Sequence, residues 1–240
     1  MTERLYFNDP YQKEFEAEII AIEGNAVRLD KSLFYPTSGG QPGDTGILSA
    51  ANQNFDVAAT VKDKEQDEII HLLPEGSSLP RIGDKVAGKI DWETRYQHMR
   101  MHTAMHLLCS LIEGDATGGQ IGAQKSRLDF NVPGDAYDKE VLTRQLNKLI
   151  EADHPVSTSW ITDEELIDNP QLIRTMSVKP PMGSGRVRVV QIGAEDNIID
   201  FQPCGGTHVN STGEIGEIRI SKIENKGKQN RRFHIVFNEE

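Results

Sequence analysis

The sequence has 240 residues, a net charge of −11 at neutral pH and 37% hydrophobic residues. This length is sufficient for one large or two modest domains with a sizeable core. The acidic balance argues against nucleic-acid binding through a broad cationic surface, although a local basic patch is compatible with it. No apolar run approaches the length of a membrane span, and residues 2–4 lead into no signal-peptide pattern. The two cysteines make no disulfide framework, so we expect a cytoplasmic protein with no membrane or DNA partner.

The N-terminal part, residues 1–90, has the pattern of short strands joined by turns. An alternating segment turns at Gly24-Asn25 and returns, which predicts a hairpin. A second hairpin is predicted across the polar stretch 62–68. Several short strands with regular turns indicate a small β-barrel. The predicted strands are 16–22, 26–29, 56–61, 69–73 and 83–90.

Between the two predicted hairpins lies a glycine-rich segment, residues 34–46, with four glycines and two prolines. Glycine permits backbone conformations that other residues avoid, and proline fixes one dihedral angle, so this segment has a specific backbone shape. A surface loop is the simpler interpretation of its composition. Thr37 and Gln41 are its neutral hydrogen-bonding side chains considered below.

The second part, residues 91–240, begins with a long helix. Asp91 or Thr94 can cap it, and Gly114 can end it near Glu113. A second amphipathic helix is predicted over 139–153, and a capping box at Thr162 predicts a short third helix. Helices and strands do not alternate strictly, so we expect an α+β fold with an antiparallel sheet. Residues 117–130 are predicted to form a glycine-rich turn that enters a strand, and the other predicted strands of this part are 186–192, 198–202, 215–223 and 231–237.

The long helix carries two histidines, His102 and His106, four residues apart. Residues i and i+4 lie on one face of a helix, so both imidazoles can reach one point. A second pair with the same separation, Cys204 and His208, follows about a hundred residues later. Either pair alone is weak evidence, because single histidines are often satisfied core residues. Together the pairs predict a four-coordinate zinc site with one Zn²⁺ per chain.

Two alternatives concern this helix. His98 lies four residues before His102 and could replace His106, although a polar helix residue near a domain boundary needs no ligand role. A zincin-type peptidase requires Glu beside the first histidine as general base, and Thr103 stands there instead. The sequence therefore does not favour a peptidase.

One cationic stretch stands out in this acidic chain. Between residues 222 and 232 there are five basic residues and one acidic residue, Glu224. Such a stretch is often a solvated hairpin, and it can also contact RNA phosphates. The proposed phosphate-contacting residues are Lys125, Arg127, Lys222, Arg231 and Arg232.

Five blocks together carry a family resemblance over nearly the whole chain. Their order and spacing resemble the AlaX family, free-standing relatives of the editing domain of alanyl-tRNA synthetase, in its longer form. One difference is that Lys125 directly precedes Ser126, where the synthetase motif usually has a glycine between them. The blocks are 34–41 with 44–46, His102 with His106, 124–126 before 128–130, 204–209, and 212–216.

The resemblance implies an N-terminal β-barrel domain, residues 1–90, and a two-layer α/β editing domain, residues 91–240, with a helix-borne zinc site. It implies hydrolysis in trans of tRNA(Ala) charged chiefly with serine, with glycine as a second candidate. Thr37 is then the candidate contact for the serine hydroxyl. Gln41 and Gln124 are further neutral groups that could face the substrate, and a turn-stabilising role is the alternative for all three.

The metal's role stays open at this point. Zinc with four protein ligands is usually structural, whereas zinc with three ligands and a water is usually catalytic. It would either activate water or anchor the substrate's amino group. Two other functions remain to be separated from the deacylase: a non-catalytic zinc-stabilised tRNA-binding module, and an editing domain like that of threonyl-tRNA synthetase.

Overall fold

The computed structural model describes residues 2–50, 52–63, 67–132, 137–175, 182–183 and 185–238. The chain divides into two compact units, Met1–Tyr96 (unit 1) and Gln97–Glu240 (unit 2). The assignment of a barrel domain and an editing domain to these parts stays a prediction. Among the described residues, no helix combines the length and the apolar character needed to cross a membrane.

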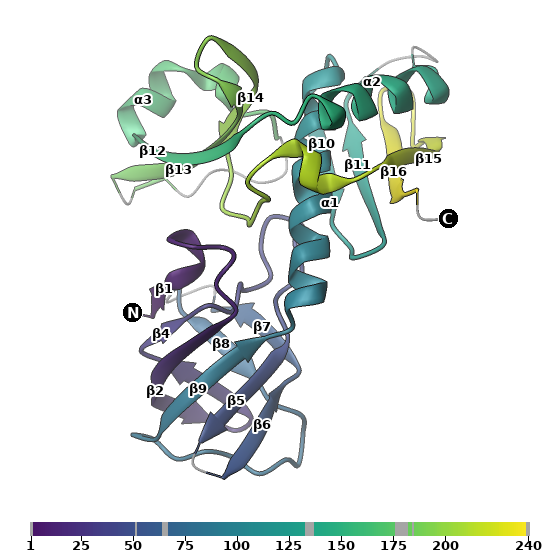
Figure 1. The fold of residues 1–240 in the computed structure, drawn as a ribbon. Coiled ribbons are helices and arrows are strands. Elements are labelled where there is room, and N and C mark those ends of the chain that lie inside the picture. The colour runs from purple at the N-terminus through teal and green to yellow at the C-terminus, as the bar shows by residue number, and fades with distance from the viewer. Residues whose placement is uncertain are drawn as a thin grey trace. The chain divides into compact units, whose positions relative to one another are not determined.

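Unit 1 consists mainly of antiparallel strands (Figure 1). In the described part of this unit, seven strands form a sheet in the order β6-β5-β9-β2-β3-β8-β7, and β1 and β4 form a short parallel pair. Its strands are β1 (Glu3–Arg4), β2 (Glu14–Glu23), β3 (Ala26–Leu29), β4 (Lys31–Ser32), β5 (Gly46–Ala50), β6 (Gln53–Val57), β7 (Ala59–Lys62), β8 (Ile69–Leu72) and β9 (Lys85–Ile90), and Leu5–Phe7 form a 3-10 turn.

The first predicted hairpin is confirmed, because β2 and β3 pair antiparallel. The second prediction was wrong in one respect: the segment 56–61 is not one strand. It breaks at Ala58 into the end of β6 and the start of β7, which lie at opposite ends of the sheet. β7 then pairs with β8 as expected, and the middle of their connection, residues 64–66, lies outside the described residues. Within the described residues no pairing joins β6 to β7, so the predicted barrel is unconfirmed.

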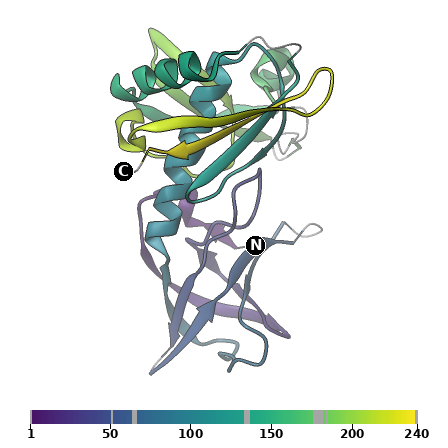
Figure 2. The same ribbon diagram turned by 90° about the vertical axis from the view of Figure 1, so that its right-hand side faces the viewer.

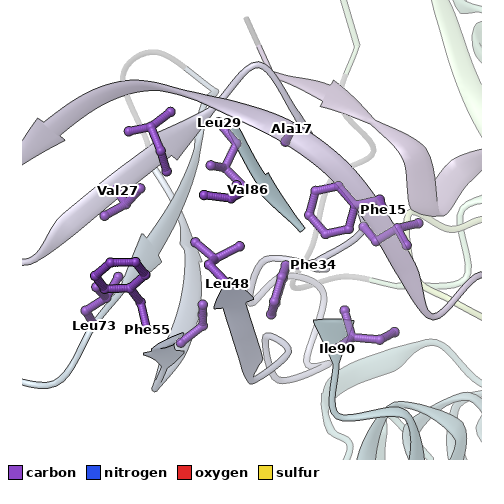
Figure 3. Close-up of a cluster of buried hydrophobic side chains, with 13 residues drawn as sticks. Phe15, Ala17, Val27, Leu29, Phe34, Leu48, Phe55, Leu73, Val86 and Ile90 are labelled. Carbon is purple, nitrogen blue, oxygen red and sulfur yellow. The ribbon is translucent and has the colours of Figure 1, made fainter. Parts of the chain in front are cut away.

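The core of unit 1 follows from strand alternation. Along β2, Phe15, Ala17 and Ile19 are buried while the residues between them are exposed. Period-two alternation places these three on one face of the sheet, where they meet apolar residues of the other strands. Figure 3 shows Phe15, Phe34 and Leu48 within this buried cluster.

The helix α1 (Trp92–Leu111) begins beside Asp91, whose carboxylate accepts hydrogen bonds from the backbone and hydroxyl of Thr94. It ends two residues earlier than predicted. From Met99 to Cys109 nearly every side chain is buried, so the helix is covered on all sides rather than on one stripe. Polar side chains in this stretch therefore need partners inside the protein.

The described residues of unit 2 form two antiparallel sheets and two further helices (Figures 1 and 2). The orders are β10-β11-β16-β15 and β12-β13-β14. Its elements are β10 (Ala116–Gln120), β11 (Lys125–Phe130), α2 (Lys139–Glu151), β12 (Val156–Thr162), α3 (Asp163–Asp168), β13 (Arg186–Ala194), β14 (Asn197–Pro203), β15 (Ile218–Asn225) and β16 (Arg231–Phe237), with 3-10 turns at Pro170–Leu172 and Thr212–Ile215.

The helices of unit 2 follow their capping signals. Asp138 caps α2, and the predicted capping box of α3 is present between Thr162 and Glu165. α2 lies along β15, where the side-chain amide of Asn147 exchanges two hydrogen bonds with the backbone of Ile218. The predicted strand 215–223 starts later, because its first residue belongs to a 3-10 turn. The fold is α+β and mostly sheet.

Candidate metal centre

The four predicted ligands converge in unit 2. His102 and His106 come from the same face of α1, and Cys204 and His208 come from the segment that follows β14. One donor atom from each residue lies within 4.8 Å of the other three. The Cys204 Sγ atom is 3.5 Å from Nε2 of His102 and 3.4 Å from Nε2 of His208. The residue of α1 that joins His102 in this group is His106 and not His98.

Hydrogen bonds outside the cluster orient two of the imidazoles. Nδ1 of His106 lies 2.8 Å from Oδ2 of Asp200, and Nδ1 of His208 lies 3.1 Å from Oγ1 of Thr103. With Nδ1 engaged, Nε2 of each ring is the nitrogen left for the centre. Ligating histidines in metal sites usually donate the N–H of the other nitrogen to an oxygen acceptor such as a carboxylate.

These outer partners are themselves held. Gln202 donates a hydrogen bond of 2.9 Å to the Asp200 carboxylate, which limits its movement. The Thr103 hydroxyl donates to the backbone carbonyl of Met99 at 3.0 Å, one turn earlier in α1. Its oxygen therefore accepts from Nδ1 of His208, which makes Nε2 of that ring the unprotonated nitrogen.

A buried arginine fixes the loop that carries the thiol. The backbone N–H of Cys204 donates to the carbonyl of Arg188 at 3.1 Å. In return, Nη1 of Arg188 donates to the carbonyls of Cys204 and Gly206, at 2.8 and 2.9 Å. The N–H of Gly206 then points to Sγ of Cys204 at 3.4 Å. The loop is thus set by β13 before any ion binds.

The charges of the cluster favour a thiolate. Burial alone would raise the pKa of the Cys204 thiol, but the imidazoles of His102, His208 and His106 lower it well below its usual value. Burial alone would lower the pKa of His106, whereas the Cys204 thiolate and Asp200 raise it to about 10. The thiolate is the form of cysteine that binds metals.

The other cysteine differs in this respect. Burial, together with the Asp200 carboxylate, raises the pKa of Cys109 to about 12. Cys109 is therefore a neutral thiol near pH 7, packed in the core of unit 2.

Three imidazole nitrogens and one thiolate form a donor set that suits zinc, which prefers nitrogen and sulfur ligands in tetrahedral geometry. The four donors already converge, and two have the outer partners typical of metal sites. The residues therefore fit the predicted ion. The structure supports a cluster that could hold a metal.

The predicted substrate residues lie in different units. Thr37 and Gln41 belong to the glycine-rich loop of unit 1, whereas Gln124 is exposed just before β11 in unit 2. The Thr37 hydroxyl forms two hydrogen bonds within the protein: it donates to the Thr60 carbonyl at 3.2 Å and accepts from the Gly43 N–H at 2.9 Å. Gln41 is fully buried. Their substrate roles stay predictions.

The glycine-rich loop has an anchor that the sequence did not reveal. Nε of Arg95, a fully buried residue of α1, contacts both carboxylate oxygens of Asp44 at 2.9 Å, and Nη2 donates to the Leu33 carbonyl at 2.6 Å. Asp44 also accepts from the Tyr35 N–H at 2.6 Å. Gly43 is required nearby, because a Cβ there would lie 1.9 Å from the Thr60 carbonyl oxygen.

The predicted phosphate-contacting residues lie on β11, β15 and β16. Lys125 and Lys222 are exposed. Arg232 forms two 2.7 Å bonds to the Asp129 carboxylate, which Arg127 also contacts. These cations share one sheet, and their contact with RNA stays a prediction.

Arg231 differs from the other cations of this group. It is buried, and its Nη1 donates to Asn225, Gly227 and Asn230 in the β15–β16 turn. Its guanidinium therefore has a structural role in the hairpin.

Several residues of the site were not predicted from the sequence. Asp200 and Gln202 precede Cys204 at alternate positions, so their polar side chains share the strand face that leads to the thiol. This alternation in an otherwise apolar strand was an available signal. Thr103 had been considered only as the residue that replaces a peptidase glutamate, and nothing local indicates Arg188.

Two family models match separate parts of the chain. Residues 187–234 match the model described as threonyl and alanyl tRNA synthetase second additional domain. Residues 6–94 match the model described as tRNA synthetases class II (A). The first match contains Cys204 and His208, and the second contains the glycine-rich loop.

Longer similarities cover nearly the whole chain. It is 39% identical over 246 residues to the alanyl-tRNA editing protein AlaX-M of Methanosarcina mazei, covering 98% of this chain and 96% of that protein. It is 38% identical to the AlaX-M of Saccharolobus solfataricus, covering 98% of both. It is also 39% identical to the alanine–tRNA ligase of Archaeoglobus fulgidus, covering 93% of this chain and 24% of the ligase.

Proposed function

Because this chain belongs to the AlaX family of alanyl-tRNA editing proteins, we propose that it hydrolyses the aminoacyl ester of mischarged tRNA(Ala) in trans. We propose serine as the chief amino acid removed and glycine as a second one. The convergence of the four donors His102, His106, Cys204 and His208 is the observation that carries the proposal, because an ester hydrolase of this kind needs a fixed site for the reacting end.

The chemical need for such an activity follows from the limits of size selection. A pocket that accepts alanine rejects a near-isostere with one extra hydroxyl by only about 100-fold. A second site that requires this hydroxyl can remove the error after charging. It needs a hydrogen-bonding group for the side chain and electrophilic or donor groups near the ester.

We propose that His102, His106, Cys204 and His208 hold one Zn²⁺. When bound, zinc can lower the pKa of a water molecule or polarise and position polar groups of the substrate. Asp200 keeps His106 in one orientation, and Thr103 does the same for His208. Arg188 keeps the Cys204 loop in place, so the substrate end would meet a preformed surface.

The role of Thr103 also argues against a peptidase. In a zincin the residue after the first histidine is a glutamate that acts as general base. Here the Thr103 hydroxyl is buried and bonds His208 and the Met99 carbonyl. It positions a ligand and carries no titratable proton near neutral pH.

Thr37 is our candidate for recognition of the serine hydroxyl. Its oxygen uses its proton on the Thr60 carbonyl and one lone pair on the Gly43 N–H. A hydroxyl oxygen has two lone pairs, so one stays available to a donor such as a serine hydroxyl. Gln41 and Gln124 are proposed as further neutral contacts.

The proposal is tested by incubating the protein with Ser-tRNA(Ala), Gly-tRNA(Ala) and Ala-tRNA(Ala) and measuring ester loss from each. We expect rapid loss of serine and little loss of alanine. Hydrolysis of none of the three would favour a non-catalytic tRNA-binding module. Faster release of serine from tRNA(Thr) than from tRNA(Ala) would favour an activity like threonyl-tRNA synthetase editing.

A further inference from the structure

The strand β12 exposes an aromatic ring that has no role in the proposed hydrolysis. Trp160 is 45% exposed, although tryptophan is among the more buried residue types on average. Arg186, on the adjacent strand β13, places its guanidinium over this ring with Cζ 4.5 Å from the ring centroid. β12 is an outer strand of its three-stranded sheet. The molecule therefore presents a stacked Trp–Arg pair at a sheet edge.

This pair shares a sheet face with Arg188, the residue that fixes the Cys204 loop. Trp160 lies directly opposite Arg188 in the β12–β13 register, and opposite residues of an antiparallel pair point to the same side. Arg188 in turn bonds the carbonyl of Cys204 at 2.8 Å. Trp160, Arg188 and Cys204 thus form one row across the sheet. At about 4.8 Å per strand, Trp160 lies about 10 Å from Cys204.

The chemistry of the pair indicates single-stranded nucleic acid. Aromatic rings stack with bases of any sequence, and arginine adds attraction to phosphates and to the base faces. A tRNA ends in an unpaired strand whose last three nucleotides are CCA, and the final adenosine carries the amino acid. Stacked nucleotides advance about 3.4 Å each, so about 10 Å is the length of these three.

This inference rests on the proposed function. We propose that Trp160 and Arg186 bind the unpaired 3′ end of the tRNA while its ester reaches the metal ligands. Trp160 stacks on one of the terminal bases, and Arg186 pairs with a phosphate between them. Both are positioning residues, since neither touches the ester.

Fluorescence tests the stacking directly. The chain has two tryptophans, so the Trp92→Phe variant leaves Trp160 as the only one. Trp92 belongs to unit 1, where its ring stacks on Tyr96, and phenylalanine preserves an aromatic ring there. The probe is an uncharged acceptor-stem RNA hairpin ending in unpaired CCA. We expect it to quench Trp160 fluorescence, and we expect the same hairpin without these three nucleotides to leave the fluorescence unchanged. Equal responses to both hairpins, or no response to either, would overturn the proposal.

Kinetics test the consequence for the reaction. Base–aromatic stacking is worth about 1–3 kcal/mol, so Trp160→Leu should lower kcat/KM on Ser-tRNA(Ala) about 5- to 150-fold. Trp160→Phe should recover most of the loss. The matched control is Ile198→Ala, which removes another exposed apolar side chain, 52% exposed, from the same sheet. Ile198 lies on β14, six residues before Cys204 and about 20 Å away along an extended chain, and its variant should behave as the parent.

Arg186→Gln should reduce the salt dependence of binding by about 0.7 units of log–log slope, the value for one phosphate on a single strand. Zinc content should equal that of the parent in all these variants. A Trp160→Leu variant with parental kinetics would contradict the proposal. The two proposals fail separately: a parent protein that hydrolyses no ester defeats the proposed function, whereas the fluorescence arm uses uncharged RNA and judges the stacking alone.

Discussion

Unit 1 buries the ion pair of Arg95 and Asp44, and unit 2 buries three imidazoles around the thiol of Cys204. In unit 1 the partners of the charges are protein groups: each carboxylate oxygen of Asp44 receives donors from Arg95, and Arg95 also donates to the backbone of Leu33. In unit 2 the donor atoms of the four residues converge, and each lies within 4.8 Å of the others.

The histidines show the same contrast. His71 in unit 1 is fully buried, with Nε2 2.8 Å from the Ser32 hydroxyl and Nδ1 3.1 Å from the Val27 carbonyl, so both ring nitrogens have protein partners. His106 and His208 have such a partner on Nδ1 and direct the other nitrogen into the cluster. A buried imidazole with protein partners on both nitrogens is fully satisfied by the fold, whereas imidazoles whose second nitrogens converge on one another form a group that could hold an ion.

Loss of the thiolate should have the largest effect. Cys204→Ala removes the sulfur donor of the cluster and opens the site, and structural zinc contributes roughly 10 kcal/mol in small zinc domains. We expect about one zinc per chain in the parent by elemental analysis and almost none in the variant, together with loss of deacylation.

The control for this experiment is Cys109→Ala, which removes the neutral thiol that lies in α1. It should keep its zinc. A parent protein that is free of metal after exhaustive chelation and still fully active would defeat the zinc proposal.

Asp44→Asn tests the structural side of the contrast. Removing one charge of a buried pair leaves the other uncompensated, which costs about 3–5 kcal/mol. We expect a fall of this size in the free energy of unfolding of unit 1, followed by denaturant titration, and unchanged zinc content. Glu14→Gln is the matched control, because the Glu14–Lys89 pair is 67% exposed at both side chains and should contribute less than about 1 kcal/mol. Equal effects of both variants would mean that the Asp44 pair does not hold the loop.

His71 should make unit 1 sensitive to acid. Burial lowers its pKa from 6.5 to about 4, against the smaller opposing effect of the Val27 carbonyl. Between these two pKa values the unfolded chain binds a proton that the folded chain does not, so stability falls as pH drops from 6.5 to 4 and loses nothing further below that range. The loss between pH 7.5 and 5 should be about 2 kcal/mol.

His71→Gln supplies the reference, because glutamine does not titrate. The measurement is the free energy of unfolding at both pH values in a Trp160→Phe background, where Trp92 reports on unit 1. The quantity of interest is how the difference in stability between this background and its His71→Gln variant changes with pH, rather than either absolute stability. A parallel pH dependence in both proteins would show that another group causes the acid sensitivity.

The two α1 histidines of the cluster could be predicted to lie together because helix geometry is local. Four-residue spacing placed His102 and His106 on one face without any knowledge of the fold. The outer partners were not predictable in this way, since Arg188 and Asp200 reach the site only through strand register, which depends on how β12, β13 and β14 pair.

The glycine-rich loop shows the opposite case. Its composition indicated a special backbone, and the resemblance indicated a substrate contact, but the reason for the shape lay elsewhere. Arg95 is 51 residues from Asp44 and stands in a helix without any local mark of burial. The break at Ala58 was missed for the same reason: alternation continues through it, and only the pairing of β6 and β7 with different neighbours reveals it.

Thr37→Val decides whether the loop does more than hold its own shape. Valine keeps the volume and removes the hydroxyl. If the Thr37 oxygen accepts from the serine hydroxyl, its loss costs about 1–3 kcal/mol, or roughly 5- to 150-fold in the rate of serine release. Glycine has no hydroxyl, so its release should slow much less. The variant also loses the hydroxyl's bonds to the Thr60 carbonyl and the Gly43 N–H, and these losses should affect both substrates equally. Thr37→Ser keeps the hydroxyl and should restore serine release, while zinc content should be the same in all three proteins. Equal slowing of serine and glycine release by Thr37→Val would mean that the hydroxyl stabilises the glycine-rich loop and does not contact the serine side chain.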